Sequence, residues 1–266
     1  MFQDYLDLRG TRLAYRLSGK GPALLLLHGW ALDGGMWQAL QKRLARRYRV
    51  LAVDRRGYGR SSGRPSIERE VDDLRILCQR LGLRNIAVLG MSQATRVALR
   101  LSRSRSLRIS CLVLDGPPGP TRGEQDPATE DPPVTRYRAL VASRGMQAFR
   151  REWAAHPLMR LPSARRGSRW LLAKMGRRYP GRDLRDAGRP SAPTRPLSPS
   201  RIRTPTLVLC GAEDMPARQE AALALSRQLP RAGFLRLAGA AHLPNLDDPQ
   251  GYERTVARFL RRHARS

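Results

Sequence analysis

The sequence predicts an α/β protein with a mostly parallel central sheet flanked by helices and a helical cap inserted after the sixth strand. Three observations support this fold class. Short apolar runs alternate with helical patterns along most of the 266 residues, which is typical of βα units on a parallel sheet. The alternation stops between Asp115 and Thr204, where Pro-rich stretches enclose a separate helical interval. Hydrophobic residues make up 41% of the chain, enough for a sizeable core.

The expected strands are short apolar runs bounded by turn residues, and the first two form an antiparallel pair around a Gly turn. They lie within residues 5–17, 22–29, 49–62, 85–90, 109–116, 204–211 and 232–239. The expected helices have apolar positions at helical spacing. They cover residues 36–47, 66–82, 94 to about 103, 217–229 and 247–263. Ser66 is suited to cap the second of these helices and Gly82 to end it.

The interval between the sixth and seventh strands is predicted to be a helical cap over one edge of the sheet. Residues 134–180 contain helical patterns, and the flanking segments 116–133 and 188–201 are rich in Pro, Gly or Ser. The expected division of the chain is a first part of the core at 1–116, the cap at 117–203 and a second part of the core at 204–266.

The chain is strongly basic, with a formal net charge of +28 and a pI near 11.6. Its basic residues are 47 Arg and 3 Lys, spread from end to end rather than clustered. This spread favours an arginine bias of the genome over a specific electrostatic role. No nucleic-acid-binding motif accompanies the charge, so we expect no specific nucleic-acid partner.

The cysteines and the N-terminus bear on cofactors and location. Cys78, Cys111 and Cys210 are isolated in apolar or helical runs, as expected for core residues in a reducing compartment. No Cys or His has metal-ligand spacing, and we expect neither a metal nor an organic cofactor. The N-terminus lacks the basic segment of a signal peptide, and no apolar run reaches about 18 residues. We therefore expect a cytoplasmic protein without a membrane span.

A serine lies at the corner between an apolar strand and a helix, in the stretch IAVLGMSQATRVALRL at 86–101. On such a strained turn, Ser92 would expose its hydroxyl at the carboxyl edge of the sheet. The next N–H, that of Gln93, lies at a helix N-terminus, which favours a developing anion. Because serine is a weak nucleophile without an adjacent base, this hypothesis requires a histidine and an acid elsewhere in the chain.

Two later strand ends supply these groups. Asp214 follows the run TLVLCG, and His242 follows the last predicted strand. Serine, acid and histidine then occur in the chain order known for triads built on α/β sheets. His242 would take the proton of Ser92, and Asp214 would orient and stabilise the imidazole. Asp115, at the end of the run SCLVLD, is the alternative acid.

Five segments in order resemble the landmarks of the α/β-hydrolase family: HGW, DRRGYGRSS, GMSQA, GAEDMP and AAHLPNLDDP. The resemblance covers nearly the whole chain. It implies an oxyanion hole formed by the N–H groups of Trp30 and Gln93, with His28 bracing the Trp30 loop. One position departs from the family pattern, which usually has Gly two residues after the serine. Here Ala94 adds a methyl group, a modest packing risk at the corner.

The resemblance implies a serine esterase that cleaves a small-molecule carboxylic ester or lactone through an acyl-enzyme. The segment HGWALDGGMW is also similar to pimeloyl-acyl-carrier-protein methyl ester esterases, which dock an acidic carrier protein through basic cap residues. Residues 117–204 contain 19 Lys and Arg against 7 Asp and Glu, so a carrier-protein-linked methyl ester and an acidic partner are an alternative. A binding protein that has kept the fold without turnover is another, since fold alone does not prove function.

The cap would cover the site, exclude water and set specificity. Its apolar side chains are expected in the core of the cap or, less favoured, against the substrate. They are Tyr137, Met146, Phe149, Trp153, Met159, Trp170 and Met175. Four further polar residues are expected to have structural roles: Asp54 in its loop, Asp247 and Asp248 at the start of the last helix, and His156 in the cap.

Overall fold

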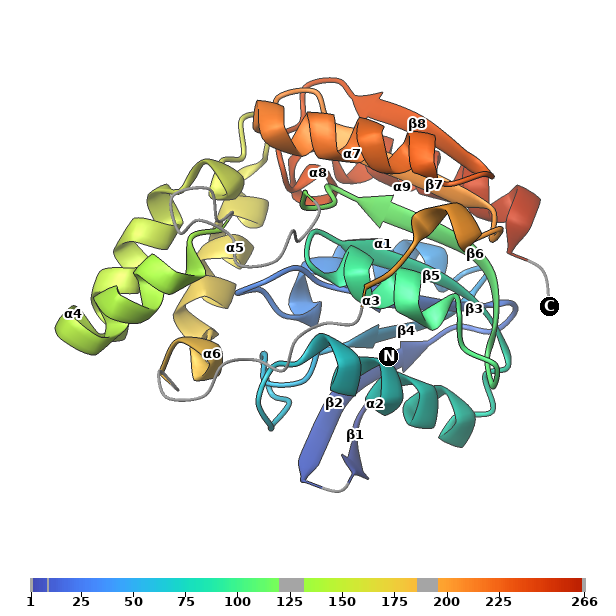
Figure 1. Cartoon of the computed structure of the whole chain (residues 1–266), viewed down its shortest axis with the longest axis horizontal. Helices are drawn as coiled ribbons and strands as arrows, with labels where there is room; N and C mark the ends of the chain where they lie inside the picture. The colour runs from blue at the N-terminus through green and yellow to red at the C-terminus, as the bar shows by residue number, and fades with distance from the viewer. Residues whose placement is uncertain (1, 9, 120–131, 186–195, 265–266) are drawn as a thin grey trace.

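A single eight-stranded sheet forms the centre of the protein (Figure 1). The computed structural model describes residues 2–8, 10–119, 132–185 and 196–264. The strands are β1 (Phe2–Leu8), β2 (Thr11–Ser18), β3 (Ala23–Leu27), β4 (Arg49–Val53), β5 (Asn85–Met91), β6 (Arg108–Asp115), β7 (Thr206–Gly211) and β8 (Ala232–Leu237). Their order in the sheet is β1-β2-β4-β3-β5-β6-β7-β8. The pairs β1–β2 and β2–β4 are antiparallel and the rest are parallel, which confirms the predicted class.

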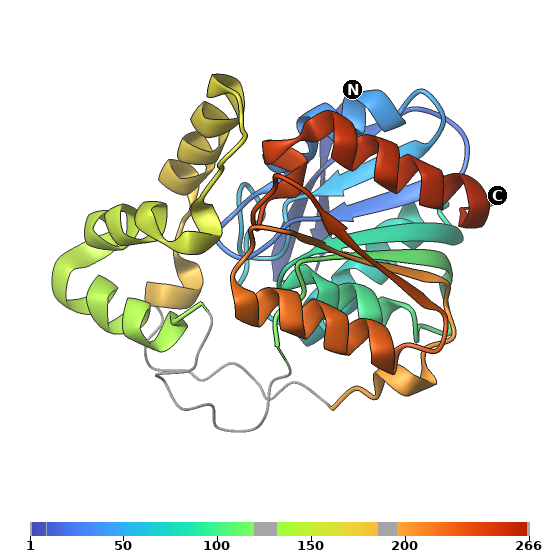
Figure 2. The ribbon, with the colours of Figure 1, turned by 90° about the horizontal axis from the view of Figure 1, so that it is seen from above.

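Helices cover both faces of this sheet, as Figure 2 shows. One face carries α2 (Ile67–Arg80), α3 (Ala94–Leu101) and α7 (Pro216–Gln228), and the other carries α1 (Gln38–Leu44) and α9 (Pro249–His263). Because successive side chains of a strand point to opposite faces, a strand between two helical layers must be apolar throughout. The run ALLLL of β3 meets this requirement, since all of its residues are buried.

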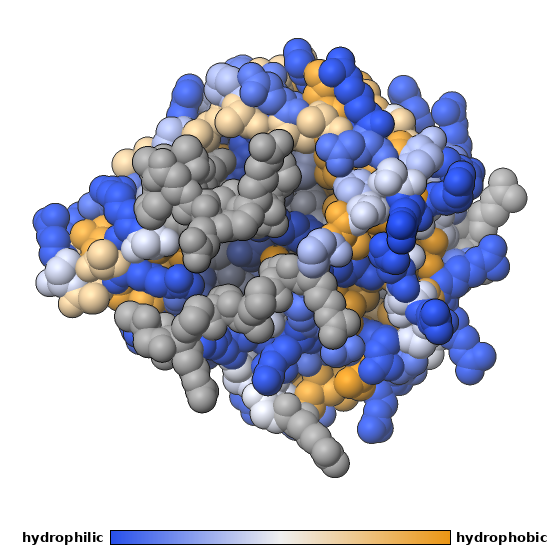
Figure 3. Space-filling view, viewed as in Figure 1, coloured by the Kyte–Doolittle hydropathy of each residue, from blue (hydrophilic) through white to orange (hydrophobic). Residues whose placement is uncertain are grey.

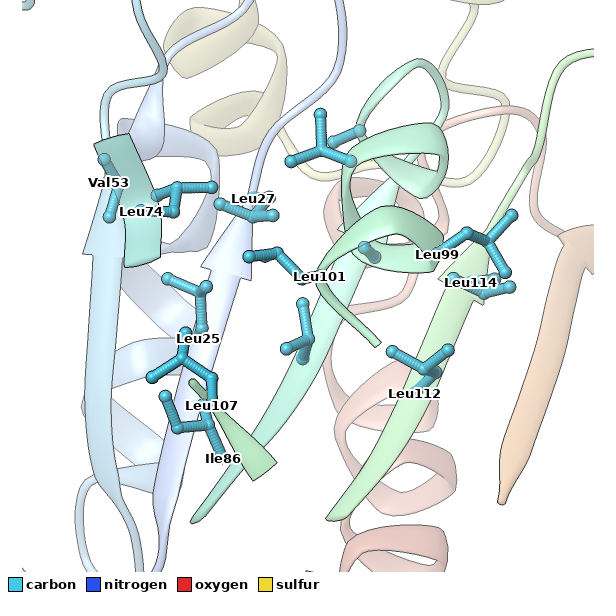
Figure 4. Close-up of a cluster of buried hydrophobic side chains, with 14 of the residues drawn as sticks. Leu25, Leu27, Val53, Leu74, Ile86, Leu99, Leu101, Leu107, Leu112 and Leu114 are labelled. Atoms are coloured by element: carbon cyan, nitrogen blue, oxygen red, sulfur yellow. The ribbon is translucent and has the colours of Figure 1, made fainter. Parts of the chain in front are cut away.

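The core therefore consists of two apolar layers, one on each side of the sheet. Leu25 and Leu27 pack with Leu74 of α2 in one layer (Figure 4), and the alternate residues Leu24 and Leu26 belong to the other. Burial of each such side chain contributes about 1.5–3 kcal/mol. The sheet is thus a rigid platform for the loops that leave its carboxyl ends.

The predicted cap is an insertion of helices between β6 and β7, beside the carboxyl edge of the sheet (Figures 1 and 2). It contains α4 (Val134–Ala155), η2 (Pro157–Met159), α5 (Arg166–Arg178) and α6 (Arg182–Arg185). Gly145, with a φ of 75° and non-helical backbone, divides α4 into two arms. The predicted linkers at 116–133 and 188–201 lie largely outside the described residues, and η3 (Pro199–Arg201) leads into β7.

Two predicted helices have different boundaries in the structure. The segment expected to be one helix at 36–47 is a short turn of 3₁₀ helix, η1 (Gly34–Trp37), followed by α1. The expected closing helix is divided into α8 (Pro244–Asp247) and α9. Pro249 lies in the first turn of α9, where a missing N–H costs nothing. Asp248 caps α9 as expected by accepting from the N–H of Gly251 at 2.9 Å.

Figure 3 shows one face of the molecule, on which hydrophilic side chains are widespread and apolar areas lie between them. Within the described ranges, no helix combines the length and the apolar character that crossing a membrane would need.

Candidate active site

Ser92 occupies a strained corner between β5 and α3. Its φ of 53° lies in the left-handed region, which costs a non-glycine residue about 1–3 kcal/mol. The N–H of Ser92 donates to the carbonyl of Asp115 at 2.7 Å, and its own carbonyl accepts from the N–H and the hydroxyl of Thr95 at 2.9 and 2.7 Å. These bonds hold the turn that the sequence predicts, with Ser92 only 6% exposed.

Gly90, rather than residue 94, makes the close crossing of β5 and α3 possible. A Cβ at Gly90 would lie 2.7 Å from the carbonyl oxygen of Ala94 and 3.1 Å from the Cβ of Ala98. Ala94 itself is completely buried in the apolar layer on this side of the sheet. The core therefore accommodates the methyl group that distinguishes Ala94 from the usual glycine, and Ser92 keeps its turn conformation.

The loops after β7 and β8 bring Asp214 and His242 together. Asp214 Oδ2 lies 2.8 Å from His242 Nδ1, and the two side chains are 1% and 2% exposed. Asp214 Oδ1 accepts from the N–H of Met215 at 2.8 Å, so both carboxylate oxygens are engaged. Gly116 makes room for the pair, because a Cβ there would lie 3.0 Å from His242 Cε1.

Ser92 and His242 line the same narrow cavity, with Trp30 and Met159 among its walls. Within the described part of the chain, Ser92 Oγ accepts a 3.4 Å hydrogen bond from Arg218 Nη1, and no hydrogen bond joins it to His242. The imidazole of His242 thus contacts Asp214 and lines the cavity of Ser92. Among the described residues, it forms no hydrogen bond with the serine hydroxyl. Such bonds are often long before substrate binds and tighten in the complex.

Asp115, the alternative acid, has another partner. The hydroxyl of Tyr252 donates to Asp115 Oδ2 at 2.9 Å. Complete burial raises the pKa of Asp115 from 3.8 to about 8; the Tyr252 bond opposes this rise and the charge of Asp214 adds to it. Asp115 is therefore a neutral carboxylic acid at pH 7, whereas Asp214 contacts the imidazole.

The loop after β3 lies against the serine corner. A Cβ at Gly29 would lie 2.7 Å from Met91 Sδ and 3.3 Å from Ser92 Cβ, so a side chain at this position would crowd the serine corner. Ala31, with a φ of 56°, turns the chain directly after Trp30. Across the described ranges, the N–H groups of Trp30 and Gln93 donate to no protein acceptor. Two such donors beside a nucleophile are what an oxyanion hole needs, and this role remains a prediction for both residues.

His28 and Asp54 hold this loop and its neighbour. The N–H of Arg55 donates to His28 Nε2 at 2.9 Å, so Nδ1 carries the proton and donates to the carbonyl of Gly29 at 2.8 Å. Burial, reinforced by the charge of Arg55, lowers the pKa of His28 to about 3, and the ring is neutral. Asp54 accepts from the N–H of Gly34 at 2.9 Å. These are bracing contacts rather than contacts with the serine cavity.

Asp183 of α6 is a cap residue that sequence reasoning missed. Trp30 Nε1 donates to Asp183 Oδ2 at 2.6 Å, and the hydroxyl of Tyr179 donates to the other carboxylate oxygen. The Trp30 ring also packs against Phe149 and Trp153. The cap thus holds the loop that carries the Trp30 N–H. Nothing in the sequence pairs Trp30 with Asp183, since 153 positions separate them.

Arg218 is the second residue that the sequence analysis missed. It lies in the first turn of α7, is 1% exposed and reaches Ser92 Oγ. Ala222 and Ser226, one and two turns later, are buried on the same helix face. Arg218 thus shares one helix face with the small residues Ala222 and Ser226, at the spacing i, i+4, i+8. This spacing is a signal in the sequence that Arg218 points inward.

A wider apolar groove adjoins the serine cavity. Leu32, Trp153 and Met159 line both spaces, and the groove has a volume of about 350 Å³ between α4, α5 and the loop after β3. Its walls also carry three arginines, Arg150, Arg169 and Arg177. The groove and the serine cavity therefore share part of a wall, and the groove carries cationic side chains.

Most of the apolar cap residues are buried as expected, with one exception. The buried ones are Tyr137, Met146, Phe149, Trp153 and Met175, and Met159 is partly buried. Trp170 is 58% exposed, so its expected place in the cap core is wrong. It lies on the outer face of α5, where the ammonium of Lys174 is 4.7 Å from its ring centroid.

Two further polar residues have defined contacts. His156 caps η2, because its Nδ1 accepts from the N–H of Leu158 at 3.2 Å. The expectation that Asp247 caps the last helix is wrong. Asp247 instead accepts from the N–H groups of Ala241 and Ser163 at 2.9 and 3.2 Å, which ties the cap to the residue preceding His242.

Comparison with known proteins places this arrangement in a family. Residues 22–249 match the family model described as the alpha/beta hydrolase fold. A pimeloyl-acyl-carrier-protein methyl ester esterase of Nitrosomonas europaea is 27% identical over 242 residues, covering 88% of this chain and 94% of that protein. The protein of the same name from Pectobacterium atrosepticum is 26% identical over 253 residues, covering 93% and 98%.

A solved structure of a thermophilic esterase from Thermogutta terrifontis is similar along its whole length. It superimposes with a TM-score of 0.77 at 25% identity, covering 98% of this chain and 99% of that one. The match of the family model extends over most of the chain. The chain therefore belongs to the α/β-hydrolase fold family, among its esterase-like hydrolases.

Proposed function

We propose that this protein is a serine hydrolase that cleaves a carboxylic ester or lactone through an acyl-enzyme. The observation that carries the proposal is the buried 2.8 Å contact between Asp214 Oδ2 and His242 Nδ1 beside the cavity of Ser92. A carboxylate that accepts from Nδ1 leaves Nε2 as the basic nitrogen, which suits the imidazole to take a proton from a serine. Membership of the family and the esterase relatives support this class of reaction.

In the proposed reaction, His242 takes the proton of Ser92 while Oγ attacks the carbonyl carbon. The N–H groups of Trp30 and Gln93 bind the oxyanion, and His242 then protonates the leaving alcohol. A water molecule deprotonated by His242 releases the acid from Ser92. Asp214 orients the imidazole and stabilises the imidazolium throughout.

The first test is hydrolysis of p-nitrophenyl esters from acetate to octanoate. Ser92→Ala is expected to reduce kcat by about 10³-fold or more, because the nucleophile is lost. Ser143→Ala, which changes an exposed serine of α4, is the matched control and keeps the wild-type rate. The acyl length at which kcat/KM is greatest then measures the depth of the pocket.

Two results would contradict the proposal. One is a folded Ser92→Ala protein that hydrolyses esters at the wild-type rate. The other is wild-type protein that hydrolyses no ester and whose Ser92 is not labelled by a fluorophosphonate, which would favour a binding protein that has kept the fold.

A second candidate is hydrolysis of a methyl ester on an acyl chain carried by an acidic carrier protein. It is favoured by the names of the two relatives and by the groove whose walls carry Arg150, Arg169 and Arg177. The test compares the carrier-bound methyl ester with the free methyl ester of the same chain. A carrier preference that falls with added salt supports this candidate, and equal kcat/KM values oppose it.

A further inference from the structure

The cavity that holds Ser92 is much smaller than an ester substrate. Its volume is about 10 Å³, which is the space of about one water molecule. The adjoining groove between α4, α5 and the loop after β3 has a volume of about 350 Å³, and most of the residues that line it are apolar. A substrate with an acyl chain therefore needs space beyond the cavity, and the groove is an adjoining space large enough to supply it.

Three side chains form the wall that the two spaces share: Leu32, Trp153 and Met159. Trp153 is 5% exposed and packs edge-on against Trp30, with the ring centroids 4.9 Å apart. Leu32 is 3% exposed and belongs to the apolar layer that contains α1 and α9. Because protein interiors are close-packed, neither of these two side chains leaves its place without displacing several neighbours.

Met159 is the shared wall residue that can move at little cost. Its side chain is only partly buried and packs at the edge of two apolar clusters, that of Leu32 and that of Trp30. Its N–H donates to the carbonyl of His156 at 2.8 Å, so the backbone of η2 is held while the side chain turns. Methionine is unbranched, has three rotatable bonds and adapts to irregular apolar surroundings. A change of its rotamer would therefore remove part of the shared wall.

The position of the groove indicates which half of an ester it receives. Ala31 and Leu32 line the groove, and they directly follow Trp30, the predicted N–H donor to the carbonyl oxygen. The described walls of the groove include no residue from the loop of His242, which must protonate the leaving oxygen. The groove is therefore placed for the acyl chain rather than for the alcohol.

We propose that Met159 is a gate between the serine cavity and the groove. When its side chain turns away, the two spaces become one pocket, which receives the unbranched acyl chain of a medium-length carboxylic ester. This inference rests on the proposed serine hydrolase function and identifies a residue that determines which acyl chains the site accepts.

The test measures the ratio of kcat/KM for p-nitrophenyl octanoate to that for p-nitrophenyl acetate. Met159→Ala is expected to raise this ratio about fivefold, because the longer chain no longer has to hold the methionine away from its preferred rotamer. Met159→Phe is expected to lower the ratio by about tenfold, because a bulkier and stiffer side chain fills the passage. Met146→Ala changes a methionine of the cap core that lines neither space, and it is expected to keep the wild-type ratio.

A purely structural role for Met159 predicts a different result. Loss of the shape of the site would lower both rates in both variants by the same factor and leave the ratio unchanged. That outcome, or a change of the ratio in the same direction in Met159→Ala and Met159→Phe, would overturn the proposal.

A glycine of α5 tests whether the chain enters the groove. Gly176 lines the groove, and a Cβ there would meet no atom within 4 Å, so Gly176→Leu adds a side chain to the groove without a clash at its Cβ. It is expected to abolish the gain of Met159→Ala when the two are combined. Gly167→Leu is the matched control, because Gly167 lies on the same helix, is equally open and lines neither space. A gain that survives Gly176→Leu would contradict the proposal.

A measurement without turnover separates the gate from the proposed function. Binding of octanoate to Ser92→Ala is measured by calorimetry, with and without Met159→Phe. Weaker binding in the double variant supports the gate even if the wild type cleaves no ester. Equal binding in the two proteins contradicts the gate, even if Ser92 proves to be the nucleophile of an esterase.

Discussion

At the scale of single residues, the candidate site depends on which aspartate serves the imidazole. Asp115 ends β6 and Asp214 lies in the loop after the neighbouring strand β7, and the sequence leaves both open as the acid. Two observations distinguish the two aspartates. The hydroxyl of Tyr252 donates a hydrogen bond to Asp115 Oδ2, and burial keeps the Asp115 carboxyl protonated at neutral pH. Stabilising an imidazolium requires a carboxylate, and the carboxylate in contact with His242 is that of Asp214.

Substitution of each aspartate by asparagine tests this assignment. Asp214→Asn is expected to lower kcat by about 10³–10⁴-fold, because the amide cannot stabilise the imidazolium or fix its tautomer. Asp115→Asn keeps an acceptor for Tyr252 and is expected to leave kcat near the wild-type value. Steady-state hydrolysis of the best p-nitrophenyl ester measures both. Equal losses in the two variants would show that Asp115 takes part in the reaction.

At the scale of elements, the cap does more than cover the cavity. Asp183 of α6 accepts from the Trp30 side chain and from Tyr179, and the Trp30 ring is enclosed by aromatic residues of α4. The backbone N–H of Trp30 is the predicted oxyanion donor. A displacement of α6 would therefore move a donor whose catalytic value depends on its position.

Asp183→Asn is expected to uncouple the cap from this loop. The asparagine has one acceptor oxygen for two buried donors, so Trp30 Nε1 or the Tyr179 hydroxyl loses its partner, at a cost of about 1–3 kcal/mol. We expect kcat for p-nitrophenyl acetate to fall by about tenfold with little change in KM, because the small acyl group does not depend on the cap for binding.

The double variant Asp183→Asn/Trp30→Phe separates positioning from general destabilisation. Phenylalanine removes the Nε1 donor, so the loss in the double variant is expected to be smaller than the sum of the single losses. Additive losses would show that Asp183 acts independently of Trp30. Asp72→Asn, at an exposed position of α2, is the control for a neutralised carboxylate.

The order of elements could be predicted from the sequence because each local pattern agrees with the fold. The run of β3 is apolar on both faces, and the serine corner follows directly from Gly90 and Ser92 between a strand and a helix. The contacts of Asp183 and Arg218 could not be predicted. The contacts of Asp183 depend on how the cap docks onto the core, which no local pattern encodes. The spacing of Arg218, Ala222 and Ser226 could indicate the inward face of α7, but not that Arg218 reaches Ser92.

At the scale of the whole molecule, burial in the core shifts the pKa values of His28 and Asp115 in opposite directions. The pKa of His28 is lowered from 6.5 to about 3, chiefly by burial. Below pH 6.5 the unfolded chain binds a proton at His28 that the folded chain does not, so stability falls as the pH drops toward 3. The pKa of Asp115 is raised from 3.8 to about 8. Above pH 3.8 the unfolded chain releases a proton at Asp115 that the folded chain keeps, so stability falls as the pH rises toward 8.

Between about pH 4 and 6.5, the effects of His28 and Asp115 on stability have opposite signs as the pH rises. Above about pH 6.5 only the loss of stability caused by Asp115 remains. The combined contribution of His28 and Asp115 to the free energy of unfolding is therefore expected to change little up to about pH 6.5 and to decrease from there to pH 8. Asp115→Asn removes the titrating carboxyl, so the decrease is expected to be much smaller in the variant. Urea denaturation of both proteins at constant ionic strength measures the difference.

The other carboxyls with raised pKa values, Asp33, Glu70 and Asp247, are present in both proteins and cancel in this comparison. If the two proteins lose stability equally between pH 6.5 and 8, the buried Asp115 does not keep its proton in the folded state.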